Sequence, residues 1–132
     1  MKLAIDESLQ IDVDPAERYQ ITHIQVQTGE RYAFSASGQW RDHKQVCGPE
    51  GWRNWWTAYV LRFSRLHGYD LFYLTGNVDQ DESSNFPIGP AATVTMKSSG
   101  SLFLFANDLW HFYWNNHRIT EHPMRVNVCR VA

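Results

Sequence analysis

Cysteine is scarce in this sequence, with two among 132 residues, Cys47 and Cys129. Neither belongs to a CxxC pair or has a histidine pair nearby, so the usual zinc-binding spacings are absent. Two distant cysteines cannot build the disulfide framework of a small secreted scaffold. We therefore expect two reduced thiols, with a disulfide between Cys47 and Cys129 left open.

Long apolar runs and an excess of basic charge are also missing. No run approaches the roughly 18 residues of a membrane span, so we expect no membrane insertion. Twelve Lys and Arg against fourteen Asp and Glu give a net charge of −2, which provides no field to attract nucleic acid. Residues 1–8 lack the apolar core of a secretory signal. We expect a cytoplasmic protein, with export without a leader left open.

The motifs of common enzymes are absent: there is no GxSxG, no HExxH and no phosphate-cradling glycine loop. His43 lies near Cys47, but loop neighbours rarely form a Cys/His nucleophile pair. Asp108 with Asp42 or Glu50 would suit glycoside hydrolysis only at a defined separation, which the sequence does not fix. We therefore predict binding without turnover.

A sustained 3.6-residue hydrophobic period does not occur. Apolar residues alternate instead, and strand-sized segments recur at intervals of about 10 residues, which is typical of a β-sandwich. The length suits one domain over residues 1–132. We predict an all-β, single-domain antiparallel β-sandwich of the jelly-roll type.

The expected strands follow from this alternation. The turn at residues 28–30 predicts that segments 19–26 and 32–38 pair as a hairpin, and 38–56 and 76–85 are expected to be loops. The segments with strand character are 1–17 (one or two short strands), 19–26, 32–38, 59–63, 69–74, 91–96, 100–106 and 124–131.

Oxygen donors and aromatic rings concentrate in residues 107–116, between two expected strands. Asp108, Asn115 and Asn116 offer the carboxylate and amide oxygens that Ca²⁺ binds in sets of six to eight. Neighbouring side chains alternate faces in a strand, so the two asparagines converge only if the chain turns there. Further ligands would have to come from carbonyls or a bound ligand's hydroxyls. The same residues are also ordinary at hairpin ends, where they cap their own backbone.

The segment 38–56 holds four of the six tryptophans. A loop this long is more often functional than idle. Its indoles either cover the core as a lid or present flat apolar faces on which a sugar ring can stack.

Several segments together resemble the PA-I galactophilic lectin family of calcium-dependent, galactose-binding bacterial lectins. The likeness spans about residues 20–130, and its most specific part is Asp108 followed at +7 and +8 by Asn115 and Asn116. The other matching segments are Thr-Gly-Glu at 28–30, Ala-Ser-Gly-Gln-Trp at 36–40, Cys-Gly-Pro-Glu-Gly at 47–51, Phe-Pro-Ile-Gly at 86–89 and Gly-Ser-Leu-Phe-Leu at 100–104.

The resemblance implies one Ca²⁺ held by the side chains of Asp108, Asn115 and Asn116. Two main-chain carbonyls would join them, one from Phe112 and one from near Asp42, with Arg41 and His43 as its alternatives. The vicinal hydroxyls of a glycan would complete the metal shell. A homo-oligomer is left open.

The sequence departs from that family around the implied site. Trp110, His111 and Trp114 replace small Pro and Gly residues, and His117 and Arg118 follow the asparagine pair. Bulky and apolar residues at 55–58 replace polar sugar contacts, so galactose preference is not carried over.

We therefore expect a calcium-dependent lectin, with a metal-free β-sandwich interaction module as the alternative. In the alternative, the aromatic loops bind a protein partner or form an oligomer. The ligand contacts expected for the lectin are Asp108, Leu109, Asn115, Trp55, Trp56 and Trp110.

Overall fold

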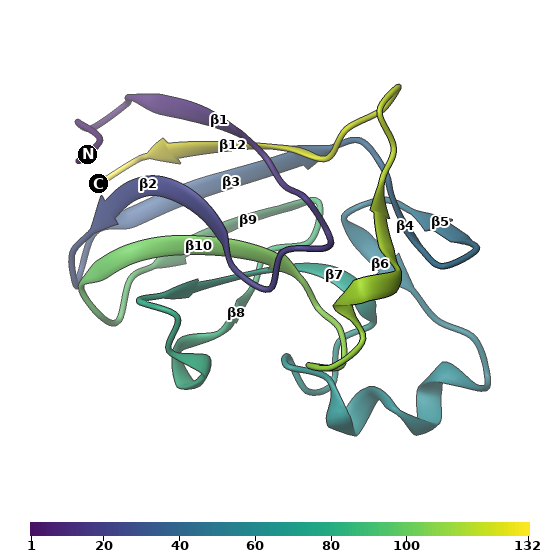
Figure 1. Cartoon of the computed structure of the whole chain (residues 1–132). Coiled ribbons are helices and arrows are strands. Elements are labelled where there is room, and N and C mark those ends of the chain that lie inside the picture. The colour runs from purple at the N-terminus through teal and green to yellow at the C-terminus, as the bar shows by residue number, and fades with distance from the viewer.

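The computed structural model describes residues 1–132 as a β-sandwich with four short 3₁₀ turns (Figure 1). The elements are β1 Ser8–Asp12, β2 Gln20–Val26, β3 Arg31–Ser37, β4 Trp40–Asp42, β5 Gln45–Cys47, β6 Glu50–Trp52, η1 Thr57–Tyr59, η2 Leu61–Phe63, β7 Leu71–Val78, η3 Glu82–Ser84, β8 Phe86–Pro87, β9 Ala91–Thr95, β10 Gly100–Ala106, η4 Tyr113–Asn115, β11 Asn116–Arg118 and β12 Arg125–Arg130.

Two antiparallel sheets form the layers. One has the order β1-β12-β3-β9, and the other has the order β2-β10-β7-β6 with β8 paired to β7. A third small sheet, β11-β4-β5, lies at the end of the molecule away from both termini (Figure 1). The prediction of an all-β sandwich is confirmed.

The core fills the space between the two large sheets. Tyr32 and Phe34 on β3 alternate with more exposed neighbours and join Val128, Ile24 and Leu104 in one cluster of 21 buried residues. Each fully buried apolar side chain of this size contributes about 1.5 to 3 kcal/mol. The period of two that predicted strands therefore also selects the face that each strand buries.

The predicted hairpin between 19–26 and 32–38 is wrong. β2 pairs with β10, whereas β3 pairs with β12 and β9 in the opposite sheet. Both strands bury one face against the same core, and the connection at residues 28–30 carries the chain from one layer to the other.

Segments 59–63, 38–56 and 76–85 also differ from expectation. Residues 59–63 lie in the 3₁₀ turns η1 and η2 rather than in a strand. Asn54 and Thr57 form a reciprocal pair of hydrogen bonds at the start of these turns. The backbone N–H of each residue donates to the side-chain oxygen of the other at 2.8 Å. The expected loop 38–56 contains β4, β5 and β6, and β7 continues to Val78.

The third sheet starts where β3 ends at a tightly packed glycine. Gly38 has φ +109°, and a Cβ there would lie 2.0 Å from the carbonyl oxygen of Pro123, so only glycine fits. Trp40 follows, fully buried edge-on to Phe72 with centroids 5.7 Å apart, and is therefore a core residue.

None of the helical segments of the structure has the length and apolar character of a membrane-spanning helix.

Candidate functional site

Asp108 follows β10 and is 3 % exposed. Its Oδ1 accepts a hydrogen bond from the Leu109 N–H at 2.7 Å, and its Oδ2 accepts one from Asn116 Nδ2 at 3.1 Å. Burial raises the pKa of this carboxyl to about 7, and the charge of Asp42 acts in the same direction. Near neutral pH the group therefore needs a proton or a cation beside it.

The two asparagines leave unpaired oxygens inside the protein. Asn116 is held by its Nδ2, which also donates to the carbonyl of Pro15 at 2.9 Å. The Oδ1 atoms of Asn115 and Asn116 are buried without a hydrogen-bond partner. Buried polar atoms in native proteins are rarely unpaired, so these two oxygens are free to bind a donor or a cation.

Asp42 reaches this position from a distant part of the chain. It lies opposite Asn116 in the β4–β11 pair, where cross-strand side chains are neighbours. The His43 N–H donates to the Asn115 carbonyl at 3.0 Å, and Trp52 Nε1 donates to Asp42 Oδ2 at 3.2 Å. Burial raises the pKa of Asp42, although the Trp52 bond and the charge of His43 oppose the shift. The structure thus gathers Asp42, Asn115, Asn116 and Asp108.

A hollow of about 270 Å³ opens beside Asp42. This site hollow is slightly smaller than the roughly 300 Å³ at which the usual range of ligand pockets begins. Apart from Asp42 and its alternative His43, sequence reasoning did not assign these residues to the site, because the folding of segment 38–56 into short strands was not expected. Its lining residues are Asp42, His43, Lys44, Gln45, Trp52 and Asn54.

The donor set fits a hard cation. No group of three His, Cys, Asp or Glu side chains converges in the structure to hold a metal, so a nitrogen and sulfur site is not formed. Asp42 and Asp108 instead lie with amide oxygens, and hard cations such as Ca²⁺ bind oxygen donors of this kind together with carbonyls and water.

Leu109 and Phe112 belong to the same loop as these donors, whereas Trp55 and Trp56 come from the segment just before η1. Phe112 immediately precedes η4, and Leu109 is fixed by the bond from its N–H to Asp108. Trp55 and Trp56 are strongly exposed and contact each other edge-to-face at 5.9 Å. Neither lines the site hollow.

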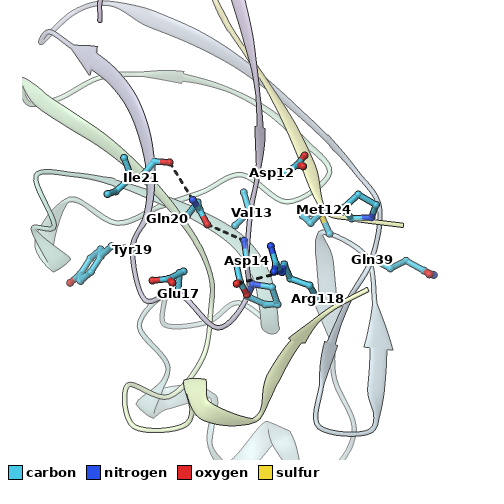
Figure 2. A pocket seen from close by; sticks show the side chains of 12 residues that line it. Asp12, Val13, Asp14, Glu17, Tyr19, Gln20, Ile21, Gln39, Arg118 and Met124 are labelled. Carbon is cyan, nitrogen blue, oxygen red and sulfur yellow. Dashed lines mark hydrogen bonds and ion pairs between the residues drawn. The ribbon is translucent and has the colours of Figure 1, made fainter. Parts of the chain in front are cut away.

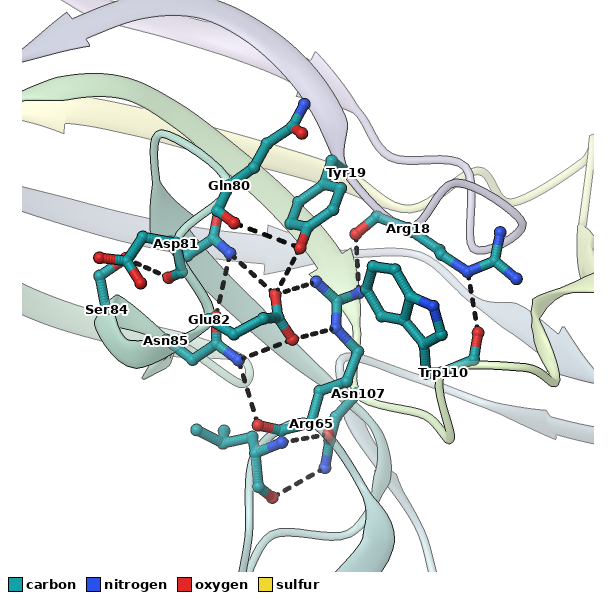
Figure 3. Close-up of polar contacts among 12 residues, drawn as sticks. Arg18, Tyr19, Arg65, Gln80, Asp81, Glu82, Ser84, Asn85, Asn107 and Trp110 are labelled. Carbon is teal, nitrogen blue, oxygen red and sulfur yellow. Dashed lines mark hydrogen bonds and ion pairs between the residues drawn. The ribbon is translucent and has the colours of Figure 1, made fainter.

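Trp110 packs on arginines. Its ring centroid lies 5.2 Å from the guanidinium carbon of Arg18 and 5.0 Å from that of Arg65 (Figure 3). Trp114 is 75 % exposed. The indoles that distinguish this loop from the family pattern therefore turn toward Arg65 or toward solvent.

Asn107 anchors the site loop. Its Oδ1 accepts from the Leu66 N–H at 2.8 Å, and its Nδ2 donates to the carbonyls of Leu66 and Asp70 at 3.1 and 3.0 Å. This fully buried amide ties the start of the loop to residues 66–70, so its role is structural.

Arg65 anchors the same loop from outside the sheet (Figure 3). Its guanidinium donates two hydrogen bonds to the Glu82 carboxylate, at 2.8 and 2.7 Å. Its guanidinium carbon lies 3.5 Å from the Phe105 ring centroid. Its Nη1 donates to the Tyr113 hydroxyl at 2.8 Å, and its backbone N–H donates to the Asp108 carbonyl at 3.2 Å.

A larger hollow of about 340 Å³ lies beyond Pro15 (Figure 2). Two of its three acidic groups already have partners: Asp14 accepts from the Ala16 N–H at 2.9 Å and lies 3.6 Å from Arg118, and Asp12 lies 3.2 Å from Arg125. Since no unpaired buried atom faces it, we assign the candidate site to Asp108 and not to this hollow.

Cys47 and Cys129 are both free thiols. Burial raises the pKa of Cys47 to about 12, and the charges of Glu50 and Asp42 add to this. A thiol that stays protonated at neutral pH is a poor nucleophile, so the raised pKa of Cys47 argues against a Cys47/His43 nucleophile pair.

Comparison with known proteins finds a similarity in structure but none to a family model or a curated sequence. A solved structure that is similar is the N-terminal domain of EclA, a PllA-like lectin, with a TM-score of 0.63 and 20 % sequence identity over 93 % of this chain and 94 % of that one. At this identity the likeness shows the fold alone, an antiparallel β-sandwich.

Proposed function

We propose that this protein is a carbohydrate-binding protein that holds a sugar through a bound Ca²⁺. The observation that carries the proposal is the pair of unpaired, buried oxygens of Asn115 and Asn116 beside the buried carboxylate of Asp108. One carboxylate and two amide oxygens, together with main-chain carbonyls, match the ligand preference of Ca²⁺. The similarity in fold to a PllA-like lectin supports a carbohydrate ligand.

The calcium ligands would be the side chains of Asp108, Asn115 and Asn116, with carbonyls from Phe112 and Asp42. Bound calcium would supply open coordination positions for two adjacent sugar hydroxyls. The residues of the chain then orient the sugar: the site hollow has room for about one ring, and Trp52 and Asn54 line it. Galactose-type sugars are the first to test, although residues 55–58 do not carry the family's polar contacts.

Binding without turnover is part of the proposal. The free Cys47 thiol is buried, and its pKa of about 12 leaves it protonated. The Asp108 carboxylate would be engaged by the cation and the Asp42 carboxylate accepts a hydrogen bond from Trp52, so neither is placed as a free general acid or base.

Calorimetry tests the proposal directly. Calcium is titrated into chelator-stripped protein, and a glycan array is then read with calcium and with chelator. We expect saturable heat at one site and glycan signals that need calcium. Asp108→Ala should lose both, whereas Asp12→Asn, which changes an exposed carboxylate on β1, should retain both.

The outcome against the proposal is equally clear. No calcium heat together with ligand binding after exhaustive chelation would refute it and favour the metal-free interaction module. A normal Asp108→Ala protein in both assays would have the same meaning.

A further inference from the structure

Exposed large aromatic side chains are concentrated in two neighbouring segments of the chain. They come from the η1–η2 segment and from the loop that follows β10, which the Ser64–Leu109 bridge joins. Both segments lie at the end of the sandwich away from the termini (Figure 1). We call this set the aromatic rim; it comprises Trp55, Trp56, Tyr59, Phe63, Phe112 and Trp114, which are 46 to 78 % exposed.

The rim is separate from the site hollow. None of its six rings is among the residues that line that hollow. Soluble proteins rarely leave so much apolar surface in one place unless it contacts a partner. A single sugar ring in the hollow would leave most of this surface exposed, so the rim requires another partner.

The charge of the rim has one sign. Residues 51–69 and 109–120 contain no Asp or Glu, although the whole chain carries a net charge of −2. Arg62 forms none of the ion pairs in the structure, and its guanidinium carbon lies 4.8 Å from the Phe63 ring centroid. Lys44, at the edge of the site hollow, is also exposed and without an ion pair. The surface therefore complements an anionic partner.

We propose that the aromatic rim docks the protein on the surface of an anionic lipid bilayer. Trp and Tyr rings are favoured at the membrane–water boundary, and basic side chains add attraction to anionic headgroups. Rings that project from short turns need no complementary pocket in a bilayer. A two-fold contact with a second copy would set the rim against itself and bring both copies of Arg62 together.

This docking does not depend on calcium or on a glycan, so its test is separate from that of the proposed function. The full chain, in chelator, is mixed with vesicles of phosphatidylcholine alone or with added phosphatidylglycerol, both without glycolipid. Co-sedimentation and the tryptophan emission maximum are measured. We expect binding with a blue shift, stronger on the anionic vesicles and weakened by salt.

Three variants define the surface. Tyr59→Ser with Phe63→Ser should weaken binding to both vesicles about tenfold or more, because two rings no longer enter the interface. Arg62→Gln should weaken binding about fivefold on anionic vesicles only, as expected for one charge near the surface. Ile21→Ser, at an exposed position on β2 outside the rim, should change nothing. Near-ultraviolet circular dichroism confirms that each variant is folded.

Three results would overturn the proposal. The first is the absence of co-sedimentation and blue shift with both vesicles. The second is binding that requires a glycolipid and calcium, which would assign it to the sugar site. The third is a dimer in sedimentation velocity that Tyr59→Ser with Phe63→Ser abolishes, without vesicle binding, which would assign the rim to a second copy.

Discussion

Replacement of Asp108 by asparagine should have opposite effects on stability and on calcium binding. The metal-free protein buries this carboxyl, whose pKa is raised from 3.8 to about 7. Below about pH 3.8 the group is protonated in both folded and unfolded chains, and it does not affect stability. Between pH 3.8 and 7 the folded chain keeps a proton that the unfolded chain has lost, so stability falls as pH rises.

The size of this effect follows from the shift. About three pKa units at about 1.36 kcal/mol each give a destabilisation on the order of 4 kcal/mol above pH 7. The amide introduced by Asp108→Asn would remove that cost but would set its own NH₂ group against Asn116 Nδ2, which lies 3.1 Å from Asp108 Oδ2 in the wild type. An unsatisfied buried donor costs about 1 to 3 kcal/mol. We expect Asp108→Asn to be more stable than wild type by roughly 1 to 3 kcal/mol at about pH 8.

Urea unfolding in chelator from about pH 4 to pH 8 measures this difference. Glu30 and Glu82 have lowered pKa values and give the opposite pH trend, but their contribution is common to both proteins and cancels. The stability advantage of Asp108→Asn should grow from about pH 4 to about pH 7 and then level off, while its calcium heat disappears. A difference that is independent of pH would refute the assignment of a raised pKa to Asp108.

Three further changes test other parts of the structure. Arg65→Met breaks the bonds to Glu82 and should lower the free energy of unfolding by roughly 2 to 3 kcal/mol, as read by urea unfolding; an unchanged midpoint would contradict the role of Arg65 as an anchor. Gly38→Ala places a methyl 2.0 Å from the Pro123 carbonyl oxygen and should cost more than about 2 kcal/mol, which thermal melting would detect as a clear fall in Tm. Cys47 should react with a thiol reagent about a thousandfold more slowly in the folded protein than after unfolding, because its pKa rises from 9.0 to about 12; equal rates would show that the thiol is accessible and ionised.

Local alternation was sufficient to predict the fold class. The strands with one clean buried face, such as β3 and β12, match their predicted segments closely. Pairing was not predictable in the same way, because β2 and β3 have the same alternation whether they share a sheet or face each other across the core. The choice depends on partners elsewhere in the chain, namely β10 for β2 and β12 for β3.

Segments without a single period were predicted poorly. Residues 59–63 are apolar enough for a strand, but Asn54 and Thr57 close a 3₁₀ turn just before them. β7 was predicted to end too early, because its last residues include polar Asn77, which is buried by its bonds to Glu82 and Asn85. A buried polar side chain resembles a loop residue in a sequence when its partners are distant or unrecognised.

One part of the candidate site could be predicted from the sequence, and the other part could not. The spacing of Asp108 and the asparagine pair marked one side of it, because all three lie in one loop. Trp52 and Asn54 were missed because the pairing of β4 with β11 brings segment 38–56 to that loop, and no local signal specifies this pairing. Functional residues supplied by one loop are thus more predictable than those supplied by contact between two.

Without a metal, the buried polar groups of the candidate site lower the free energy of unfolding. Asp108 is buried with a raised pKa, and Asn115 and Asn116 each bury an unpaired oxygen, at about 1 to 3 kcal/mol for each such atom. A sequence selected only for stability would replace these groups with apolar side chains of similar size. A cation would neutralise the carboxylate and pair both oxygens in one step. This cost supports the proposed calcium site, and calcium at about a hundred times its dissociation constant should stabilise the fold by about 2.7 kcal/mol.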